Sequence, residues 1–188
     1  MDSSAVNAEL VRLAVLGDGK ATDLLLRYLR PLVVKYCRAR VGRSATTADD
    51  VAQDVCLAVL TALPNYREQG RPFLAFVYGI AAHKVADAHR AIARNRAEPV
   101  AEVPDQPARN GGPEEAALQG ELNGTLGRLL HLLPEKQREI LVLRVVVGLS
   151  AEETAEAVGS TPGAVRVAQH RALGRLRKEI TALSVPIG

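Results

Sequence analysis

The chain has 188 residues, of which 47% are hydrophobic and 24% charged, a composition typical of an ordered protein of one domain or two small ones. No run of about 20 apolar residues is free of charge, and the N-terminus lacks the basic-then-apolar order of a signal peptide. We therefore expect a cytoplasmic protein without membrane insertion. Cys37 and Cys56 lie in apolar helical patterns and form no CxxC motif, which argues against a disulfide framework or a metal site.

The formal net charge of +3 is unevenly distributed along the chain. Residues 1–96 hold 14 Lys and Arg against 9 Asp and Glu, whereas residues 97–122 hold one basic residue against six acids. From Pro162 to the end, five basic residues stand against Glu179 alone. Attraction to phosphate is therefore predicted at the two ends, and the acidic middle should be repelled by DNA or face a basic protein surface.

The first part of the chain shows the apolar spacing of helices. Residues 5–16 and 20–41 carry this spacing, with a break at 17–19 and with Pro31 as a predicted kink. The β-branched residues fall inside helical patterns, and no alternating run is bounded by hairpin turns. We predict an all-α protein.

The next helix is predicted to begin at a capping box formed by Thr47 and Asp50 and to end near Leu63, before Pro64. Its predicted buried stripe is Val51, Val55, Ala58, Val59 and Ala62. The outward face then holds Asp49, Asp50, Gln53, Leu57 and Leu60. Acids beside exposed leucines indicate a surface that contacts another protein, but from spacing alone the leucines could equally touch a neighbouring helix of the same bundle.

Four of the six aromatic residues, Tyr66, Phe73, Phe76 and Tyr78, fall within thirteen residues. Aromatic rings interleaved with arginine can stack on unpaired bases and contact phosphates, although phenylalanine most often packs in a core. We assign Phe73 and Phe76 to the core. The better candidates for contact with nucleic acid are the loop residues Asn65, Tyr66 and Arg67, and the helix that follows continues through His83, Lys84, Asp87 and Arg90.

Residues 97–113 contain four prolines and no apolar periodicity, which predicts a flexible linker. The predicted organisation is therefore two small helical domains, residues 1–96 and 114–188, joined by an acidic linker at 97–113. The second domain should begin with a helix from Glu114 to Leu133. Another helix should follow Pro134, with Ile140, Leu141, Leu143 and Val145 as its apolar residues.

A helix-turn-helix pattern with complete capping signals occupies residues 149–177. Ser150 and Glu153 form a Ser-x-x-Glu capping box, which predicts a short helix from Ala151 that ends at Gly159. Thr161 is the predicted N-cap of a second helix, in which Pro162 occupies a position where its missing N–H costs nothing. We expect this second helix to continue to about residue 180.

At about 100° per residue, the second helix has one apolar side and one basic side. The apolar stripe holds Val165, Ala172, Leu176 and Ile180, with Gln169 among them. The opposite side and its flanks hold Arg166, Val167, His170, Arg171, Gly174, Arg175, Arg177 and Lys178. A short helix followed by a longer basic one is the arrangement that enters the major groove, so we favour DNA binding over a solvated helix in a small bundle.

The order of these parts resembles a bacterial sigma-70 family factor of the smallest, extracytoplasmic-function (ECF) group, which keeps two domains called region 2 and region 4. The resemblance covers the chain from about Leu24 to Lys178. Its motifs are Asp49-Asp50-x-x-Gln53-Asp54; Gly70-x-x-Phe73-x-x-Phe76-Val77-x-x-Ile80-Ala81 with Asp87 and Arg90; and Leu133-Pro134-x-x-x-Arg138-x-x-Leu141 leading into Val165-Arg166-x-x-x-His170-Arg171-Ala172. Each motif is weak alone, but together, in this order and spacing, they are specific.

The resemblance implies three binding surfaces. The surface for core RNA polymerase, on the β′ clamp helices, would be Asp49, Asp50, Gln53, Asp54, Leu57 and Leu60. The residues that separate and capture the minus-10 promoter element would be Asn65, Tyr66, Arg67, Arg71, His83, Lys84, Asp87 and Arg90. The residues that read the minus-35 element would be Thr161, Arg166, Val167, His170, Arg171, Arg175 and Lys178. The resemblance also implies a contact with the polymerase β flap and control by an anti-sigma factor.

The sequence departs from the family's usual pattern in both domains. Phe76 stands where the family usually has Trp, and His83 stands where it usually has Asn. In the recognition helix, Val167 and Ala168 occupy positions that are often polar or basic. The minus-35 sequence therefore cannot be taken over from relatives.

Two other classes of protein were weighed against this resemblance. A two-domain regulator with a response-regulator-type output domain would share the helix-turn-helix but would lack the Asp50 and Gln53 helix and the aromatic loop. An enzyme fits less well, because the four histidines are dispersed and neither a Ser/His/Asp set nor a phosphate-binding glycine loop is evident. No cofactor or metal is predicted.

Overall fold

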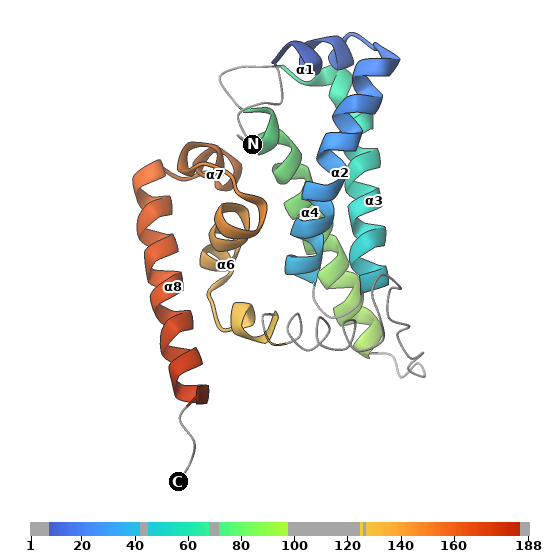
Figure 1. Cartoon of the computed structure of the whole chain (residues 1–188). Helices are drawn as coiled ribbons and strands as arrows, with labels where there is room; N and C mark the ends of the chain where they lie inside the picture. Colours follow the sequence, from blue (N-terminus) through green and yellow to red (C-terminus); the bar gives the residue numbers. More distant parts are fainter. Residues whose placement is uncertain (1–7, 42–44, 68–71, 98–124, 126, 185–188) are drawn as a thin grey trace, which may run out of the picture. The chain divides into compact units, whose positions relative to one another are not determined.

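The computed structural model describes residues 8–41, 45–67, 72–97, 125 and 127–184 (Figure 1). These residues form helices and turns, and they contain no strand, so the all-α prediction is confirmed. The chain divides into two compact units, Met1–Ala108 and Arg109–Gly188. The predicted linker lies outside the described residues except for Ala97, and the bounds given above for the two domains stay predictions.

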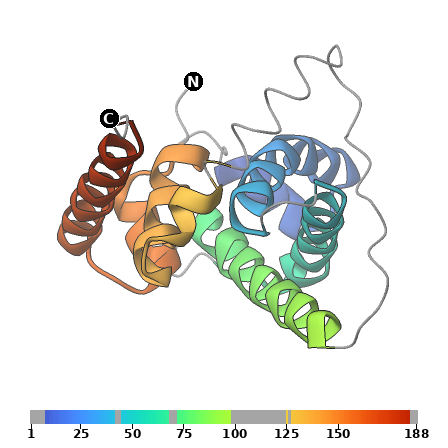
Figure 2. The same ribbon diagram turned by 90° about the horizontal axis from the view of Figure 1, so that it is seen from below.

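The first unit is a bundle of helices (Figure 1 and Figure 2). Its elements are α1 (Ala8–Val15), α2 (Gly19–Val41), α3 (Ala45–Ala62), the short 3₁₀ helix η2 (Leu63–Asn65) and α4 (Phe73–Ala97). Helices α2, α3 and α4 pack on one another, and α1 packs on α2 and η2. The largest fully buried side chains of this bundle are Leu25, Leu29, Val33, Tyr36, Val55, Val59, Val77, Tyr78 and Val85.

The predicted break between the first two helices lies at a turn with two distinct signals. Gly17 has a φ of 88°, in the left-handed region that suits glycine. Asp18 accepts a hydrogen bond from the backbone N–H of Ala21 at 2.7 Å, which caps the start of α2. Helix α2 then runs through Pro31 to Val41. Residues 5–7 of the predicted first helix lie outside the described residues.

The start and the faces of α3 differ in part from the prediction. The helix is already formed at Ala45, so Thr47 lies inside it and the predicted capping box at Thr47 is wrong. Leu57 is 54% exposed, as expected, but Leu60 is only half-exposed and does not point fully outward. Because α3 packs on both α2 and α4, its buried face is wider than one stripe. Ala48 and Ala52 are buried in addition to Val51, Val55 and Val59.

Tyr66 belongs to the core of the first unit, which corrects its assignment to an exposed loop. Its side chain is only 9% exposed, and its ring centroid lies 5.2 Å from that of Phe73 and 5.0 Å from that of Phe76. The short helix η2 turns the chain, and the N–H of Tyr66 donates to the carbonyl of Leu63 at 3.0 Å. The ring thus returns onto the first turn of α4 and is not available as a stacking platform in this structure.

The second unit contains a short helical turn at 127–131, α6 (Glu135–Leu141), the π-helix η3 (Val142–Val147), α7 (Ala151–Val158) and α8 (Pro162–Ser184). Residues 114–124 of the helix expected from Glu114 lie outside the described residues. A buried cluster of Ile140, Ala151, Ala155 and Val165 joins α6, α7 and α8. The guanidinium of Arg138 donates to the backbone carbonyls of Leu130, His131 and Leu133 at 2.9–3.2 Å, so α6 holds the end of the preceding turn.

The π-helix changes which residues after Pro134 are buried. Val142, Leu143 and Val147 are buried, whereas Val145, expected in the apolar stripe, is 57% exposed. In a π-helix the hydrogen bonds join residues five apart, and here the N–H of Gly148 donates to the carbonyl of Leu143 at 3.1 Å. This wider turn brings Val142 and Val147 to the same side of the helix, which the spacing of an ordinary α-helix does not predict.

The helix-turn-helix is capped as predicted. The Ser150 hydroxyl accepts from the N–H of Glu153 at 3.0 Å, and the Glu153 carboxylate accepts from the N–H of Ser150 at 2.8 Å. Gly159 ends α7 with a φ of 61°, and Thr161 accepts from the N–H of Ala164 at 3.2 Å at the start of α8. Helix α8 extends to Ser184, beyond the predicted end.

The apolar stripe of α8 is confirmed only in part. Val165 and Ala172 are fully buried and Leu176 is 9% exposed, but Ile180 is 49% exposed, so its assignment to the core is wrong. All described side chains from residue 177 to residue 182 are exposed. The last turns of α8 therefore extend past the part of the helix that packs on α6 and α7.

The aromatic cluster yields a first testable prediction. Replacing Tyr66 with Ala should destabilise the first unit by roughly 3 kcal/mol, because it removes a buried ring that contacts two others. Asn65→Ala, at the exposed neighbouring position, is the matched control and should change stability by less than about 0.5 kcal/mol. Chemical denaturation followed by circular dichroism measures both, and equal stability of the two variants would contradict this role of Tyr66.

A second prediction concerns the cap of α7. Ser150→Ala should destabilise the second unit by about 1 kcal/mol, because the N–H of Glu153 loses its acceptor. Ser160→Ala, in the turn between α7 and α8, is the control and should have a smaller effect. Amide exchange of α7 in the two variants checks this, and unchanged protection in Ser150→Ala would show that the capping box contributes little.

Candidate nucleic-acid interface

The basic face of α8 is the candidate surface on which every predicted contact residue is exposed. All seven residues predicted there to contact DNA are exposed, namely Thr161, Arg166, Val167, His170, Arg171, Arg175 and Lys178. Val167 is 50% exposed, an uncommon position for a valine on a helix with a buried opposite side. Because Val165 and Ala172 anchor that opposite side in the core, the basic face points to solvent along the first four turns of the helix.

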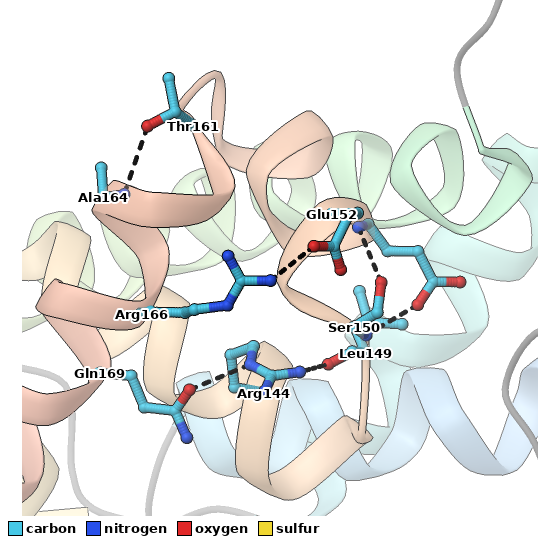
Figure 3. A network of polar contacts seen from close by, with 9 residues as sticks. Arg144, Leu149, Ser150, Glu152, Thr161, Ala164, Arg166 and Gln169 are labelled. Carbon is cyan, nitrogen blue, oxygen red and sulfur yellow. Dashed lines mark hydrogen bonds and ion pairs between the residues drawn. The ribbon is translucent and has the colours of Figure 1, made fainter.

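Arg166 on this face is tied to the first helix of the motif. Its Nη2 donates to Oε1 of Glu152 in α7 at 2.7 Å (Figure 3). Both side chains stay well exposed, at 60% for Arg166 and 62% for Glu152. The pair therefore bridges the two helices on the outside of the motif, where an approaching ligand can reach it.

A second arginine connects the π-helix to the recognition helix. Nε of Arg144 donates to Oε1 of Gln169 in α8 at 3.0 Å, and its Nη1 donates to the carbonyl of Leu149 (Figure 3). An arginine can only donate, so the Gln169 amide must turn its oxygen toward Arg144. Gln169 thus fixes the position of α8 relative to η3, consistent with its expected place on the inner side of the helix.

The Glu152 carboxylate is stabilised in its ionised form. Its pKa is lowered mainly by a hydrogen bond from the backbone N–H at its own position. Desolvation opposes this effect, and Arg166 and Arg144 add smaller contributions that lower the pKa. A carboxylate in the first turn of a helix also interacts favourably with the helix dipole. Glu152 is therefore negatively charged at neutral pH and lies near two guanidinium groups.

In the predicted protein-contact surface on α3, most side chains are exposed, and one of them, Asp49, pairs with an arginine of α2. Asp50, Gln53, Asp54 and Leu57 are exposed, and Leu60 is half-exposed. Asp49 accepts two hydrogen bonds from Arg38 of α2, at 2.9 and 2.8 Å, in a fork-to-fork pair. Hydrogen bonding to Asp49 raises the pKa of the Arg38 guanidinium above its usual value. Asp49 therefore holds α2 against α3, and Arg38 lies beside the candidate surface.

The residues predicted to capture the minus-10 element are spread over η2 and α4. Asn65, Arg67, His83, Asp87 and Arg90 are exposed, Lys84 is half-exposed, and Tyr66 is buried. Arg71 lies outside the described residues. Arg90 and Asp87 form an ion pair one turn apart, and hydrogen bonding to Arg90 lowers the pKa of the Asp87 carboxyl. In this structure the Asp87 charge is therefore balanced by Arg90.

The thiols of the first unit are buried or partly buried. Cys37 is fully buried and Cys56 is half-buried, and neither forms a disulfide. Burial, with smaller contributions from Cys56 and Asp49, raises the pKa of Cys37 to about 12. Among the described residues, His, Cys, Asp and Glu form no cluster that could hold a metal ion. None of the described helices is apolar over a length sufficient to cross a membrane.

Sequence reasoning missed Glu152 and Arg144 as parts of this surface. Glu152 lies 14 residues before Arg166, on the other side of a turn, so no helical periodicity relates the two. Arg144 lies in the π-helix, whose register the sequence pattern does not show. The one available signal for Glu152 is an acid at the start of a helix that precedes a basic helix.

Comparison with known families identifies two regions of the chain. Residues 25–95 match the family described as Sigma-70 region 2, and residues 124–176 match the family described as Sigma-70, region 4. The first match covers the bundle that carries the α3 and α4 surfaces. The second covers the helix-turn-helix through Leu176.

Relatives match over nearly the whole chain. The ECF RNA polymerase sigma factor SigD of Mycobacterium tuberculosis is 63% identical over 172 residues, which cover 90% of this chain and 81% of that protein. ECF RNA polymerase sigma factor ShbA of Streptomyces griseus is 52% identical over 183 residues, covering 94% and 96%. A solved structure of CnrH in complex with the cytosolic domain of CnrY is similar, with a TM-score of 0.70, 25% identity and coverage of 92% and 96%. The chain therefore belongs to the sigma-70 family of RNA polymerase sigma factors, in its ECF group.

Proposed function

We propose that this sigma factor binds core RNA polymerase through α3, captures the minus-10 element with the η2 and α4 segment, and reads the minus-35 element with α8. The observation that carries the proposal is the basic face of α8, which is exposed over its full set of predicted contacts while the opposite side is buried. A recognition helix must present this face to enter the major groove. The proposed place of action is the cytoplasm.

The α3 surface supports a protein partner. Asp50, Gln53 and Asp54 are exposed on the same helix as Leu57, a large apolar side chain that is 54% exposed. An apolar residue within a polar rim is the composition of a protein–protein interface. We propose that this surface binds the β′ clamp helices and that the second unit contacts the β flap.

The minus-10 assignment changes because Tyr66 is buried. With its ring packed on Phe73 and Phe76, Tyr66 supports the loop rather than stacking on a base. Contacts with the displaced strand then fall to the exposed Asn65 and Arg67, with His83 and Arg90 on α4. Unstacking a base costs a few kcal/mol, so polymerase must help to hold the opened DNA.

Control by an anti-sigma factor completes the proposal. CnrH, a structural relative, was solved in complex with the cytosolic domain of another protein, CnrY. An inhibitor that covers α3 or α8 would prevent polymerase or promoter binding, because both helices carry exposed functional residues. We propose that such a partner masks one or both of these surfaces.

Reconstitution with core polymerase tests the function directly. The full chain should direct transcription from a cognate promoter only when core polymerase is present. A two-domain regulator of the response-regulator type would instead bind its DNA site tightly without polymerase. Specific promoter binding by the chain alone, with no effect on added core polymerase, would contradict the proposal.

A third prediction places the polymerase interface on α3. Asp50→Lys should weaken binding to core polymerase about tenfold or more, because it reverses a charge within the proposed interface. Stability should change by less than about 0.5 kcal/mol, since the side chain is exposed. Fluorescence titration of labelled protein with core polymerase measures the affinity, and circular dichroism checks the fold.

Asp23→Lys is the matched control for this prediction. Asp23 is also an exposed helical acid, but it lies on α2 and outside the proposed interface. The control variant should bind core polymerase like the wild type. Equal affinities of Asp50→Lys and wild type would show that the interface lies elsewhere.

A fourth prediction concerns Val167. A valine cannot form a hydrogen bond with a base edge, but it can contact the C5-methyl group of thymine in the major groove. Val167→Ala should therefore lose discrimination between thymine and uracil at one minus-35 position, with little change in salt dependence. Binding of holoenzyme to promoters with uracil at one position at a time measures this discrimination.

Arg171→Ala gives the contrasting signature. If Arg171 contacts a phosphate, its removal should weaken binding to all sequences alike and lower the salt slope by about one. If uracil at each minus-35 position weakens binding of the wild type no more than binding of the Val167→Ala variant, Val167 does not read a base. Its exposure would then mark a contact with polymerase or with an inhibitor.

A further inference from the structure

We infer that Glu152 is a positioning residue for sequence recognition, whose ion pair directs the Arg166 guanidinium toward a guanine and away from the phosphate backbone. This inference rests on the proposed reading of the minus-35 element by α8. It adds a residue of α7, outside the recognition helix, to the determinants of specificity.

The ion pair constrains one side of the Arg166 guanidinium and leaves the rest available. Oε1 of Glu152 accepts from Nη2 at 2.7 Å, and among the described residues this is the one hydrogen bond or ion pair of the guanidinium (Figure 3). Because the guanidinium is planar and rigid, anchoring one nitrogen limits the directions in which its other donors can point. Arg166 lies in the second turn of α8, and residues near the start of a recognition helix are the ones that reach base edges.

The negative charge of Glu152 discriminates between the two possible targets of Arg166. A phosphate is repelled by a carboxylate next to its binding site, whereas the O6 and N7 acceptors of guanine carry no net charge. The capping box of Ser150 and Glu153 holds the first turn of α7, which carries Glu152, and the positive charge of Arg144 nearby also attracts its carboxylate. Arg144 is itself anchored on Gln169 and Leu149. The acid therefore stays beside Arg166 when DNA approaches.

In this arrangement Glu152 weakens binding to DNA of any sequence but strengthens discrimination at the base pair that Arg166 reads. Removing its charge should let Arg166 turn to a phosphate, which strengthens binding to any sequence. The same change should weaken discrimination at the base pair that Arg166 reads. A residue that only stabilises α7 would weaken both kinds of binding or neither.

The test uses holoenzyme assembled from the full chain and core polymerase, on a promoter selected by the wild type from a library randomised at the minus-35 element. Each guanine of that element is replaced in turn by 7-deazaguanine, which lacks the N7 acceptor. Wild type should lose roughly fivefold or more in affinity at one guanine. Glu152→Gln should lose most of this sensitivity and bind a scrambled element roughly two- to fivefold tighter.

Three further variants test whether Glu152 acts by positioning Arg166 or only by its charge. Glu179→Gln removes the same charge from an exposed position of α8 where the described structure shows no ion pair, and it should keep the wild-type sensitivity. In an Arg166→Ala background, Glu152→Gln should no longer change discrimination, because Glu152 acts through Arg166. Glu152→Asp, which keeps the charge, should restore part of the sensitivity.

The outcomes distinguish this inference from the proposed function. If wild-type holoenzyme does not depend on the minus-35 sequence, the proposed function of α8 is wrong and the inference with it. If wild type depends on the sequence but on no guanine N7, or if Glu152→Gln is as sensitive as wild type, the inference alone is overturned. An equal effect of Glu179→Gln would also overturn it.

Discussion

The contact of Val165 with Ile140, Ala151 and Ala155 is the constraint on which the second unit, residues 109–188, depends. This small apolar cluster joins three helices, and the side chains opposite it on α8 are left to solvent. Burial of one face therefore determines which residues of α8 can meet a ligand. Two arginines add polar connections around the cluster: Arg138 holds the turn before α6, and Arg144 links η3 to α8. Each uses the fixed geometry of a guanidinium to donate to acceptors in different elements.

The first unit, residues 1–108, likewise has a buried apolar core and polar pairs at its surface. Fully buried side chains from α2, α3 and α4 form its core, and Tyr36 and Tyr78 lie with their ring centroids 5.2 Å apart within it. Paired polar groups at the edge, such as Arg38 with Asp49, hold the helices in register near the surface. His89 contacts the carbonyl of Arg40 at 3.0 Å and adds a polar link between α4 and α2. The exposed residues of α3 and α4 thus lie on helices that pack on one another and on α2.

Most of the fold followed from local rules of the sequence, and the departures have physical causes. The helices, the caps at Ser150 and Thr161 and the exposed face of α8 could be predicted because each depends on residues within a few positions of one another. Tyr66, Val145 and Glu152 could not. The burial of Tyr66 depends on the direction that η2 gives the chain, and the exposure of Val145 depends on a π-helical turn. The pairing of Glu152 depends on the angle between two helices, which no periodicity encodes.

The buried thiol of Cys37 bears on how this protein can be controlled. Burial raises the pKa of Cys37 to about 12, so its thiol stays protonated at neutral pH. Burial also keeps oxidants and metal ions away from the sulfur atom, and the pKa of Cys56 is raised in the same direction by burial. Cys37, which is fully buried, is thus a packing residue of the bundle, whereas Cys56 stays partly exposed. Oxidation of Cys37 would therefore require the bundle to open around it first, because its thiol is both buried and protonated.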